Sequence, residues 1–342
     1  MTAKIYFFDD YEFSTKFLIG VSLAVALAVW WKTKANIILV LISLMAGAQG
    51  IDFNQLIKIY IQVNFWMLVI VTLAALTGII DNLAFSAGER GIRFAMGSIY
   101  PTDFAARILY LLIADAYLNF KQLSARRYLF YAAAAILLKL ITDARLNVIC
   151  IFLLIIVMII TKRAQQMAQQ QQMSDWTINL VSIYWVFTPI LAVIAQFGTM
   201  LYNPSNKIYH DVDHLLSGRL TFGHIAFERY PITWLGSHVV EHGYGNNLHL
   251  FNGGTVNYFF VDSSFVRLLI VYGIVSAVFF IGVMMYISIK RTHYRDYALP
   301  AVILIITFSS LVEQHLLEVT YNPFLLALIP TILLKSKTKG AD

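Results

Sequence analysis

The sequence predicts an all-α integral membrane protein, with about ten transmembrane helices and one large extracytoplasmic loop. Hydrophobic residues make up 59% of the 342 residues and charged residues 13%, against about 45–50% and about 25% in soluble domains. Apolar runs near the roughly 17–25 residues that cross a bilayer recur along the chain. One long polar stretch, residues 200–263, interrupts them and holds six of the eight histidines. We therefore expect residues 1–342 to form a single polytopic membrane domain.

The apolar runs predict ten spans, each ending at polar or charged residues. The first two are short and separated only by Lys32 and Lys34, so they form either two tilted spans or one re-entrant hairpin. Eight spans is therefore the alternative count. The ten expected spans cover residues 15–31, 36–50, 62–80, 103–120, 128–144, 146–161, 177–199, 264–289, 297–312 and 320–334.

Basic residues predict the orientation of these spans in the cell membrane. If ten helices alternate, one face carries 14 of the 25 lysines and arginines and the other carries 7. The richer face is cytoplasmic by the positive-inside rule. Both termini and the glutamine-rich linker 162–176 then lie in the cytoplasm, and the loop 200–263 lies outside. Lys32 and Lys34 do not follow the rule. The basic excess is explained by the membrane, so no nucleic-acid partner is expected.

Ionisable residues gather at the predicted outer ends of several spans. Each would cost roughly 2.5–3.5 kcal/mol at mid-bilayer, so each needs a partner or a water-filled cavity. Asp103 and Arg107 are four residues apart on one helix face. Glu313 and His315 occupy another outer turn, near Asn322. Ion pairs that serve helix packing explain each group separately. A single polar cavity also explains their common depth, and we favour it.

Four arginines on the same side are candidates for binding a phosphate or diphosphate. They are Arg93, Arg145, Arg219 and Arg267. Guanidinium groups bind phosphate oxygens with two parallel hydrogen bonds and stay charged when partly buried. Contact with phospholipid headgroups is the alternative explanation. Membrane lipid is an expected partner in either case.

Two short patterns in the polar loop resemble metal sites. His238-Val-Val-Glu241-His242 matches the spacing of an inverted zinc-protease motif, but nearby glycines favour a loop over the helix that such a motif needs. Asp211-Val-Asp213 resembles an acidic metal-binding pair. We interpret both as chance matches and expect no metal and no cofactor. His249, in the same loop, is a candidate cavity residue.

Several segments resemble the O-antigen ligase and polymerase superfamily, and more specifically its exopolysaccharide and capsule polymerases of the Wzy type. Together they cover the chain from about residue 50 onward. Their order and spacing carry more information than any one of them. The segments are Gly97-Ser-Ile-Tyr-Pro-Thr-Asp103, Thr142-Asp-Ala-Arg145-Leu, Leu216-Ser-Gly-Arg219-Leu, Asp262-Ser-Ser-Phe-Val-Arg267-Leu-Leu-Ile-Val-Tyr-Gly273, Glu313-Gln-His315-Leu-Leu-Glu and Tyr321-Asn-Pro-Phe.

The resemblance implies a membrane glycosyltransferase that acts outside the cytoplasmic membrane on polyprenyl-diphosphate-linked oligosaccharides. A growing glycan would pass from its lipid carrier to a new lipid-linked repeat. A chain-length regulator and a flippase are candidate partners. The related ligases have a histidine where this chain has Asp262, so the general base is Asp262 or the Glu313 and His315 pair. The alternatives are a ligase for another acceptor, a lipid-linked sugar flippase and a zinc protease.

Overall fold

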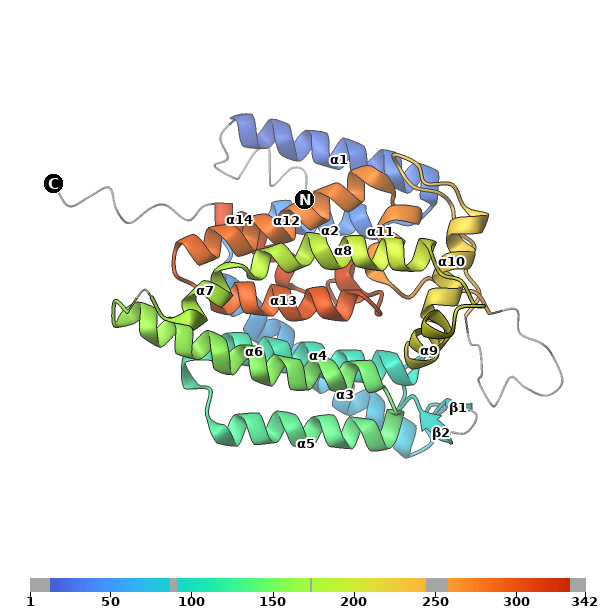
Figure 1. Cartoon of the computed structure of the whole chain (residues 1–342), viewed down its shortest axis with the longest axis horizontal. Helices are drawn as coiled ribbons and strands as arrows, with labels where there is room; N and C mark the ends of the chain where they lie inside the picture. Colours follow the sequence, from blue (N-terminus) through green and yellow to red (C-terminus); the bar gives the residue numbers. More distant parts are fainter. Residues whose placement is uncertain (1–12, 87–90, 173, 244–257, 333–342) are drawn as a thin grey trace.

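The computed structural model describes residues 13–86, 91–172, 174–243 and 258–332, and this part of the chain is mostly helical. Its long helices lie side by side with their axes nearly parallel (Figure 1). The helices before the polar loop are α1 (Phe13–Thr33), α2 (Ile37–Gly47), α3 (Phe53–Leu76), α4 (Pro101–Leu118), α5 (Ala125–Thr142), α6 (Arg145–Gln169), α7 (Trp176–Ser182) and α8 (Tyr184–Met200).

The polar loop contains two helices, α9 (Lys207–Leu215) and α10 (Arg219–Arg229). A two-stranded antiparallel hairpin joins α3 to α4 and consists of β1 (Ala84–Ser86) and β2 (Ile92–Phe94). The hairpin, α9 and α10 lie together at one end of the bundle, and α7 lies at the other (Figure 1). The later helices are α11 (Ser264–Ile270), α12 (Gly273–His293), α13 (Ala298–Ser310) and α14 (Leu328–Ile332). The 3-10 turns are η3 (Phe120–Gln122), between α4 and α5, and η4 (His315–Leu317) and η5 (Phe324–Ala327), between α13 and α14.

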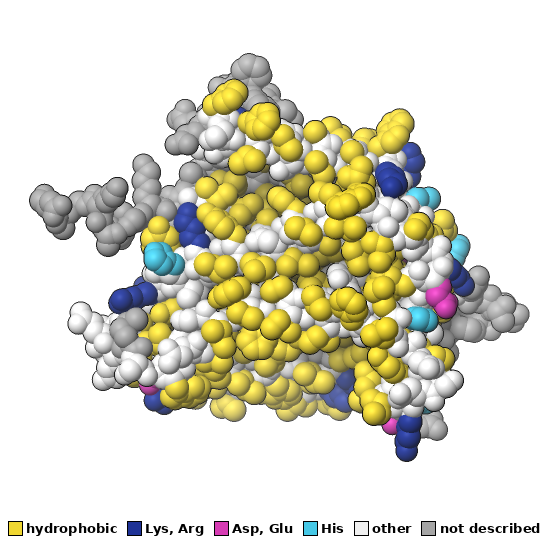
Figure 2. All heavy atoms as spheres, turned by 45° about the horizontal axis from the view of Figure 1, so that its top comes forward, with side chains coloured by type: hydrophobic (Ala, Val, Ile, Leu, Met, Phe, Trp, Pro, Cys, Tyr) yellow, Lys and Arg dark blue, Asp and Glu magenta, His cyan; other side chains and the backbone are white. Residues whose placement is uncertain are grey.

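Four described helices are long and apolar enough to span a membrane, namely α1, α3, α6 and α12. The pair α7 and α8, which is bent by 48° at its break, makes a fifth if it counts as one span. Large apolar side chains lie exposed on the bundle's outside, including Phe17, Trp66 and Leu140. Figure 2 shows hydrophobic side chains covering the middle of one face, with lysines and arginines toward its edges. Such a broad exposed apolar surface is typical of contact with lipid.

The core of the bundle is built around α13. Almost every side chain of this helix is buried, and it packs against α6, α8 and α12. A helix that is apolar all round requires neighbours on every side, and its central position brings the turn that follows it to the same end as α9 and α10.

Several elements differ from the predicted spans in their bounds. Helix α3 begins at Phe53 rather than near residue 62, because the Asp52 side chain accepts a hydrogen bond from the Asn54 nitrogen and caps it. Helix α6 continues through Gln169, so the first half of the predicted linker 162–176 is helical. Its alanine, glutamine and methionine residues all have high helix propensity. The predicted span 320–334 is mainly the short elements η5 and α14.

A candidate anion-binding cavity at one end of the bundle

A polar cavity of about 250 Å³ lies at the end of the bundle that carries α10 and the hairpin. Its walls come from segments far apart in the sequence: the first residues of α4, α6 and α10, the strand-like stretch 258–262, and the turn 313–315. The amino-terminal ends of three helices therefore surround one space. Helix amino termini carry unpaired N–H groups and a partial positive charge, which favour an anion.

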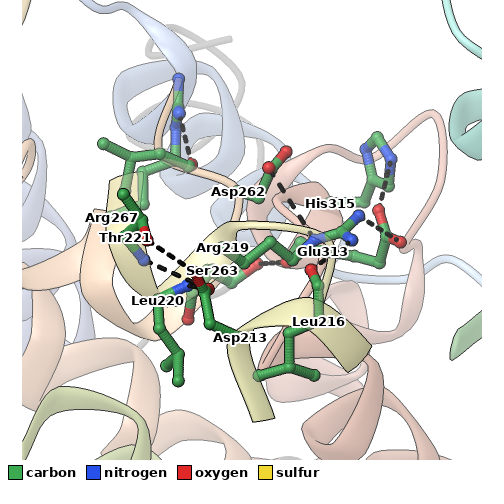
Figure 3. Close-up of polar contacts among 12 residues, drawn as sticks. Asp213, Leu216, Arg219, Leu220, Thr221, Asp262, Ser263, Arg267, Glu313 and His315 are labelled. Carbon is green, nitrogen blue, oxygen red and sulfur yellow. Dashed lines mark hydrogen bonds and ion pairs between the residues drawn. The ribbon is translucent and has the colours of Figure 1, made fainter. Parts of the chain in front are cut away.

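Arg219, the first residue of α10, lies nearly buried between two carboxylates (Figure 3). Its Nη2 atom donates to Glu313 Oε1 at 3.2 Å, and its Nη1 atom donates to the Leu216 carbonyl at 3.1 Å. Its Nε atom lies 3.8 Å from Asp262 Oδ2 and makes no hydrogen bond. A nearly buried guanidinium with one unsatisfied N–H can donate a further hydrogen bond to an oxygen that comes within reach.

The position of Arg219 is fixed by the start of α10. Gly218 adopts a left-handed conformation with φ of 84°, which turns the chain sharply into the helix. The Asp213 carboxylate then accepts hydrogen bonds from the backbone nitrogens of Leu220 and Thr221, at 2.8 and 3.2 Å. Asp213 thus caps the helix that presents Arg219. The other carboxylate of the acidic pair, Asp211, is exposed beside His210.

Glu313 lies in the turn after α13 and is almost fully buried. Its backbone carbonyl accepts a hydrogen bond from the Ser264 nitrogen at 3.1 Å, which ties this turn to the start of α11. The Asn147 Nδ2 atom lies 3.5 Å from its Oε1 atom. Burial raises the pKa of Glu313 to about 7, although Arg219 and His315 act to lower it. A carboxyl group with this pKa exchanges a proton near neutral pH.

His315 is buried beneath the cavity and surrounded by carboxylates. Its Nε2 atom lies 3.6 Å from Asp103 Oδ1 and 4.0 Å from Glu313 Oε2, and its Nδ1 atom lies 3.4 Å from Glu318 Oε1. Its ring stacks on Tyr321 with centroids 3.8 Å apart. Burial lowers the pKa of His315, but the neighbouring Glu318, Glu313 and Asp103 outweigh this and raise it.

Asp262 is more accessible than Glu313 and forms another part of the wall. Burial raises the pKa of Asp262, and the positive charges of Arg219 and Arg267 oppose that rise. Asp262 and Glu313 thus lie on either side of one guanidinium. Two carboxyl groups with raised pKa values, arranged around a cation, are a feature of sites that transfer protons.

The charged side chains around the cavity nearly balance. Three arginines face four carboxyl groups, with His315 in addition: Arg93, Arg145, Arg219, Asp103, Asp143, Asp262 and Glu313. The cavity is therefore not a simple positive pocket. An anion can bind there if arginines exchange carboxylate partners for its oxygens, or if carboxyl groups take up protons as it enters.

Of the predicted site residues, seven line this cavity: Asp262, Glu313, His315, Arg219, Arg145, Arg93 and Asp103. Arg145 begins α6, and its Nε atom lies 3.6 Å from Asp143 Oδ2. Asp143 also pairs with Lys139. Arg145 remains more than one-third exposed, so its guanidinium can adapt to a ligand that enters from outside more easily than that of Arg219.

Arg267 does not line the cavity. Both of its terminal nitrogens bind the Glu241 carboxylate, at 2.7 and 2.6 Å, and one also donates to the Val261 carbonyl at 3.0 Å. Figure 3 shows its side chain directed away from Arg219. This buried bidentate pair holds stretch 258–262 against residue 241, so the contribution of Arg267 to the site is to position the wall that carries Asp262.

Two further predicted cavity residues, Arg107 and Asn322, also lie outside it. The Arg107 guanidinium lies over the Tyr321 ring at 4.4 Å. The Asn322 side chain is fully buried and bonds to the Leu316 carbonyl and the Phe324 nitrogen. Both residues support the turn beneath His315. His249 lies outside the described residues.

Asn147 and Tyr258 are among the wall residues that were not predicted as site residues. Asn147 is buried in the first turn of α6, and its Oδ1 atom has no hydrogen-bond partner. Tyr258 lines the cavity beside Phe222. For Asn147 the sequence did carry a signal of a polar site, because an amide side chain stands in the first turn of an otherwise apolar helix. No comparable signal distinguishes Tyr258 among the many aromatic residues of the loop.

The zinc-protease pattern of the loop has other partners in the structure. Residues 238–242 are not helical. His238 Nδ1 lies 2.9 Å from the Thr33 carbonyl, and Glu241 is bound to Arg267. Within the described ranges, no three histidine, cysteine or acidic side chains come together as metal ligands.

Comparison with known proteins gives no independent indication of function. No family model matches the chain, and no curated protein or solved structure is significantly similar to it. The chemistry of the cavity therefore carries the functional argument.

Proposed function

We propose that this protein is a polysaccharide polymerase, an integral membrane glycosyltransferase that uses a polyprenyl-diphosphate-linked glycan as its donor. The observation that carries the proposal is Arg219, buried between Glu313 and Asp262 in a cavity at the end of an apolar helical bundle. This arrangement offers a guanidinium for a diphosphate and a carboxyl group for proton transfer in the same space.

The proposed topology has ten membrane crossings and the cavity at the outer face of the cytoplasmic membrane. It is supported by the count of basic residues along the sequence, because the face assigned to both termini carries 14 of the 25 lysines and arginines and the other carries 7. An excess of lysine and arginine is typical of the cytoplasmic side. Loop 200–263 is then extracytoplasmic and both termini are cytoplasmic.

In the proposed complex, the donor diphosphate binds Arg219 with help from Arg145 and Arg93. The amino-terminal ends of α4 and α6 add favourable backbone dipoles, whereas that of α10 is already capped by Asp213. Binding requires Arg219 to exchange part of its interaction with Glu313 for phosphate oxygens. The Nε atom of Arg219 has no hydrogen-bond partner and lies 3.8 Å from Asp262, so it would donate to a phosphate oxygen that displaces Asp262.

The reaction moves a glycan between two lipid carriers. A hydroxyl oxygen of the acceptor sugar attacks the anomeric carbon of the donor, and the bond from that carbon to the diphosphate oxygen breaks. The electron pair leaves with the polyprenyl diphosphate, where the arginines stabilise the developing charge. Glu313 accepts the hydroxyl proton. Its pKa of about 7 suits this role, and loss of Arg219 to the phosphate makes it a stronger base.

The resemblance to Wzy-type polymerases is supported by a feature that is independent of sequence order. Residues from five of the six similar segments line one cavity: Asp103, Arg145, Arg219, Asp262 and Glu313. If each segment resembled the family only by chance, we would not expect these segments to line the same cavity.

The direct test is elongation of purified lipid-linked repeat units by the protein in nanodiscs. Arg219→Ala should lower the transfer rate about 10²–10³-fold, the usual effect of removing one donor that stabilises developing negative charge. Arg229→Ala is the matched control, because Arg229 is exposed at the far end of the same helix. A ladder of products indicates a polymerase, whereas a single transfer to another acceptor indicates a ligase. Normal elongation by Arg219→Ala refutes the assignment.

A further inference from the structure

An apolar groove of about 390 Å³ lies directly beside the polar cavity. Its walls are the end of α8, the face of α9 and the residues that follow α13. Ile194 and Gly198 come from α8, Ile208 and Val212 from α9, and Leu311 and Val312 from the start of the turn. Most of these side chains are hydrocarbon, and Ile194 and Ile208 are strongly exposed.

The groove and the cavity share two walls. Around the start of α10, Leu216 and Leu220 line the groove, while Ser217 and Arg219 line the cavity. After α13 the division is as sharp, because the groove ends at Val312 and the cavity begins with the next residue, Glu313. A molecule that occupies both spaces must therefore be apolar at one end and polar or charged at the other.

Helix α9 is amphipathic and lies across the end of the bundle (Figure 1). Its apolar residues Ile208, Val212 and Leu215 recur at helical spacing and are exposed, and the same spacing puts His210 and His214 on the other side. A short helix of this kind is suited to the membrane surface, with its apolar face in the lipid boundary. The groove then opens toward lipid while the cavity opens toward water.

We propose that the groove holds the first part of the polyprenyl chain of the donor while its diphosphate occupies the cavity. This inference rests on the proposed function and identifies the entry route of the substrate. The donor would move laterally from the membrane between α8 and α9, with its tail in the groove and its phosphates against Arg219. The acyl chain of an ordinary phospholipid is the competing occupant.

Gly198 allows the groove to be filled without disturbing the fold. A Cβ atom built at this position meets no atom within 4 Å. Gly198→Leu should therefore place its side chain in the groove. Gly282 on α12 is a matched control, since it is also helical, also has open space, and lines a separate apolar groove against α1.

The experiment uses the full chain in nanodiscs and a sugar-free polyprenyl diphosphate with a diazirine on its first isoprene units. Photolabelling is expected on α8, α9 or residues 311–312, with displacement by unlabelled polyprenyl diphosphate but not by excess phosphatidylglycerol. Gly198→Leu should reduce labelling at least about tenfold, because two methylene groups kept out of an apolar groove account for that factor. Gly282→Leu should label like the unmodified protein.

Equal displacement by phosphatidylglycerol, labelling elsewhere, or normal labelling of Gly198→Leu would overturn the proposal. The probe carries no sugar, so its binding does not depend on transfer. Labelling of the groove without any elongation leaves the groove assignment standing and removes the polymerase assignment. If Gly198→Leu elongates with an unchanged KM for the donor, the groove assignment is refuted and the polymerase assignment stands.

Discussion

Replacing Glu313 by glutamine should stabilise the fold and abolish transfer. Burial raises the pKa of Glu313 from 4.5 to about 7, so the folded protein disfavours the carboxylate relative to the unfolded chain. Each pKa unit corresponds to about 1.4 kcal/mol, which gives about 3 kcal/mol for the whole shift. This stability is fully present below pH 4.5 and is lost as the pH rises through about 7. Glutamine stays neutral, so Glu313→Gln should keep this contribution to stability at every pH.

The measurement is thermal unfolding of both proteins in nanodiscs from low to high pH. The melting temperatures should nearly coincide at the acid end and differ by several degrees on the alkaline side, with the variant higher. Glu228→Gln, at an exposed position of α10, is the control and should show no such difference. A Glu313→Gln variant that melts lower than the unmodified protein on the alkaline side contradicts the reasoning. The Arg219 ion pair would then outweigh the cost of burial. Loss of elongation together with higher stability is the signature of a residue kept for activity.

Three further results are expected. Asp213→Ala removes the acceptor of two backbone N–H groups at the start of α10. The free energy of unfolding should fall by about 1–2 kcal/mol, and the donor KM should rise because Arg219 loses its fixed position. Asp213→Asn should recover part of the lost stability and part of the donor affinity. Gly273→Ala should lower the melting temperature sharply, because φ is 86° and a Cβ atom would lie 2.2 Å from the Gly236 nitrogen. Lowering the pH through about 7 should lower both the donor KM and kcat, since neutral Glu313 releases Arg219 to the phosphate but accepts no proton.

Much of the fold could be predicted because apolar runs and helices coincide along most of the chain. The exact ends of the helices and the breaks within them were not predicted. Hydropathy placed the third span near residue 62, although a single capping carboxylate at Asp52 starts the helix at Phe53. The predicted span 264–289 is interrupted before Gly273, where the backbone packs against Gly236. Such a contact depends on a residue far away in the sequence, so a local pattern does not reveal it.

The same limit explains which site residues were predicted. Arg219, Glu313 and His315 stood out because they are ionisable groups where polar sequence meets membrane-like sequence, and these positions converge at one end of a bundle. Arg267 has the same character but lies against Glu241. Whether an arginine faces a cavity or a neighbouring carboxylate depends on tertiary contacts, and residue type alone does not specify it.

The near balance of charge in the cavity has a consequence for the order of events. A carboxylate holds Arg219 before the donor arrives, so the empty site keeps a buried cation compensated and avoids a large desolvation penalty. The donor diphosphate then competes with Glu313 for the same guanidinium. As the phosphate succeeds, Glu313 loses its nearest cation, and its affinity for a proton increases at the moment when the acceptor hydroxyl must be deprotonated. Donor binding therefore raises the basicity of Glu313, and the carboxylate form that deprotonates the hydroxyl persists only at a pH above its raised pKa.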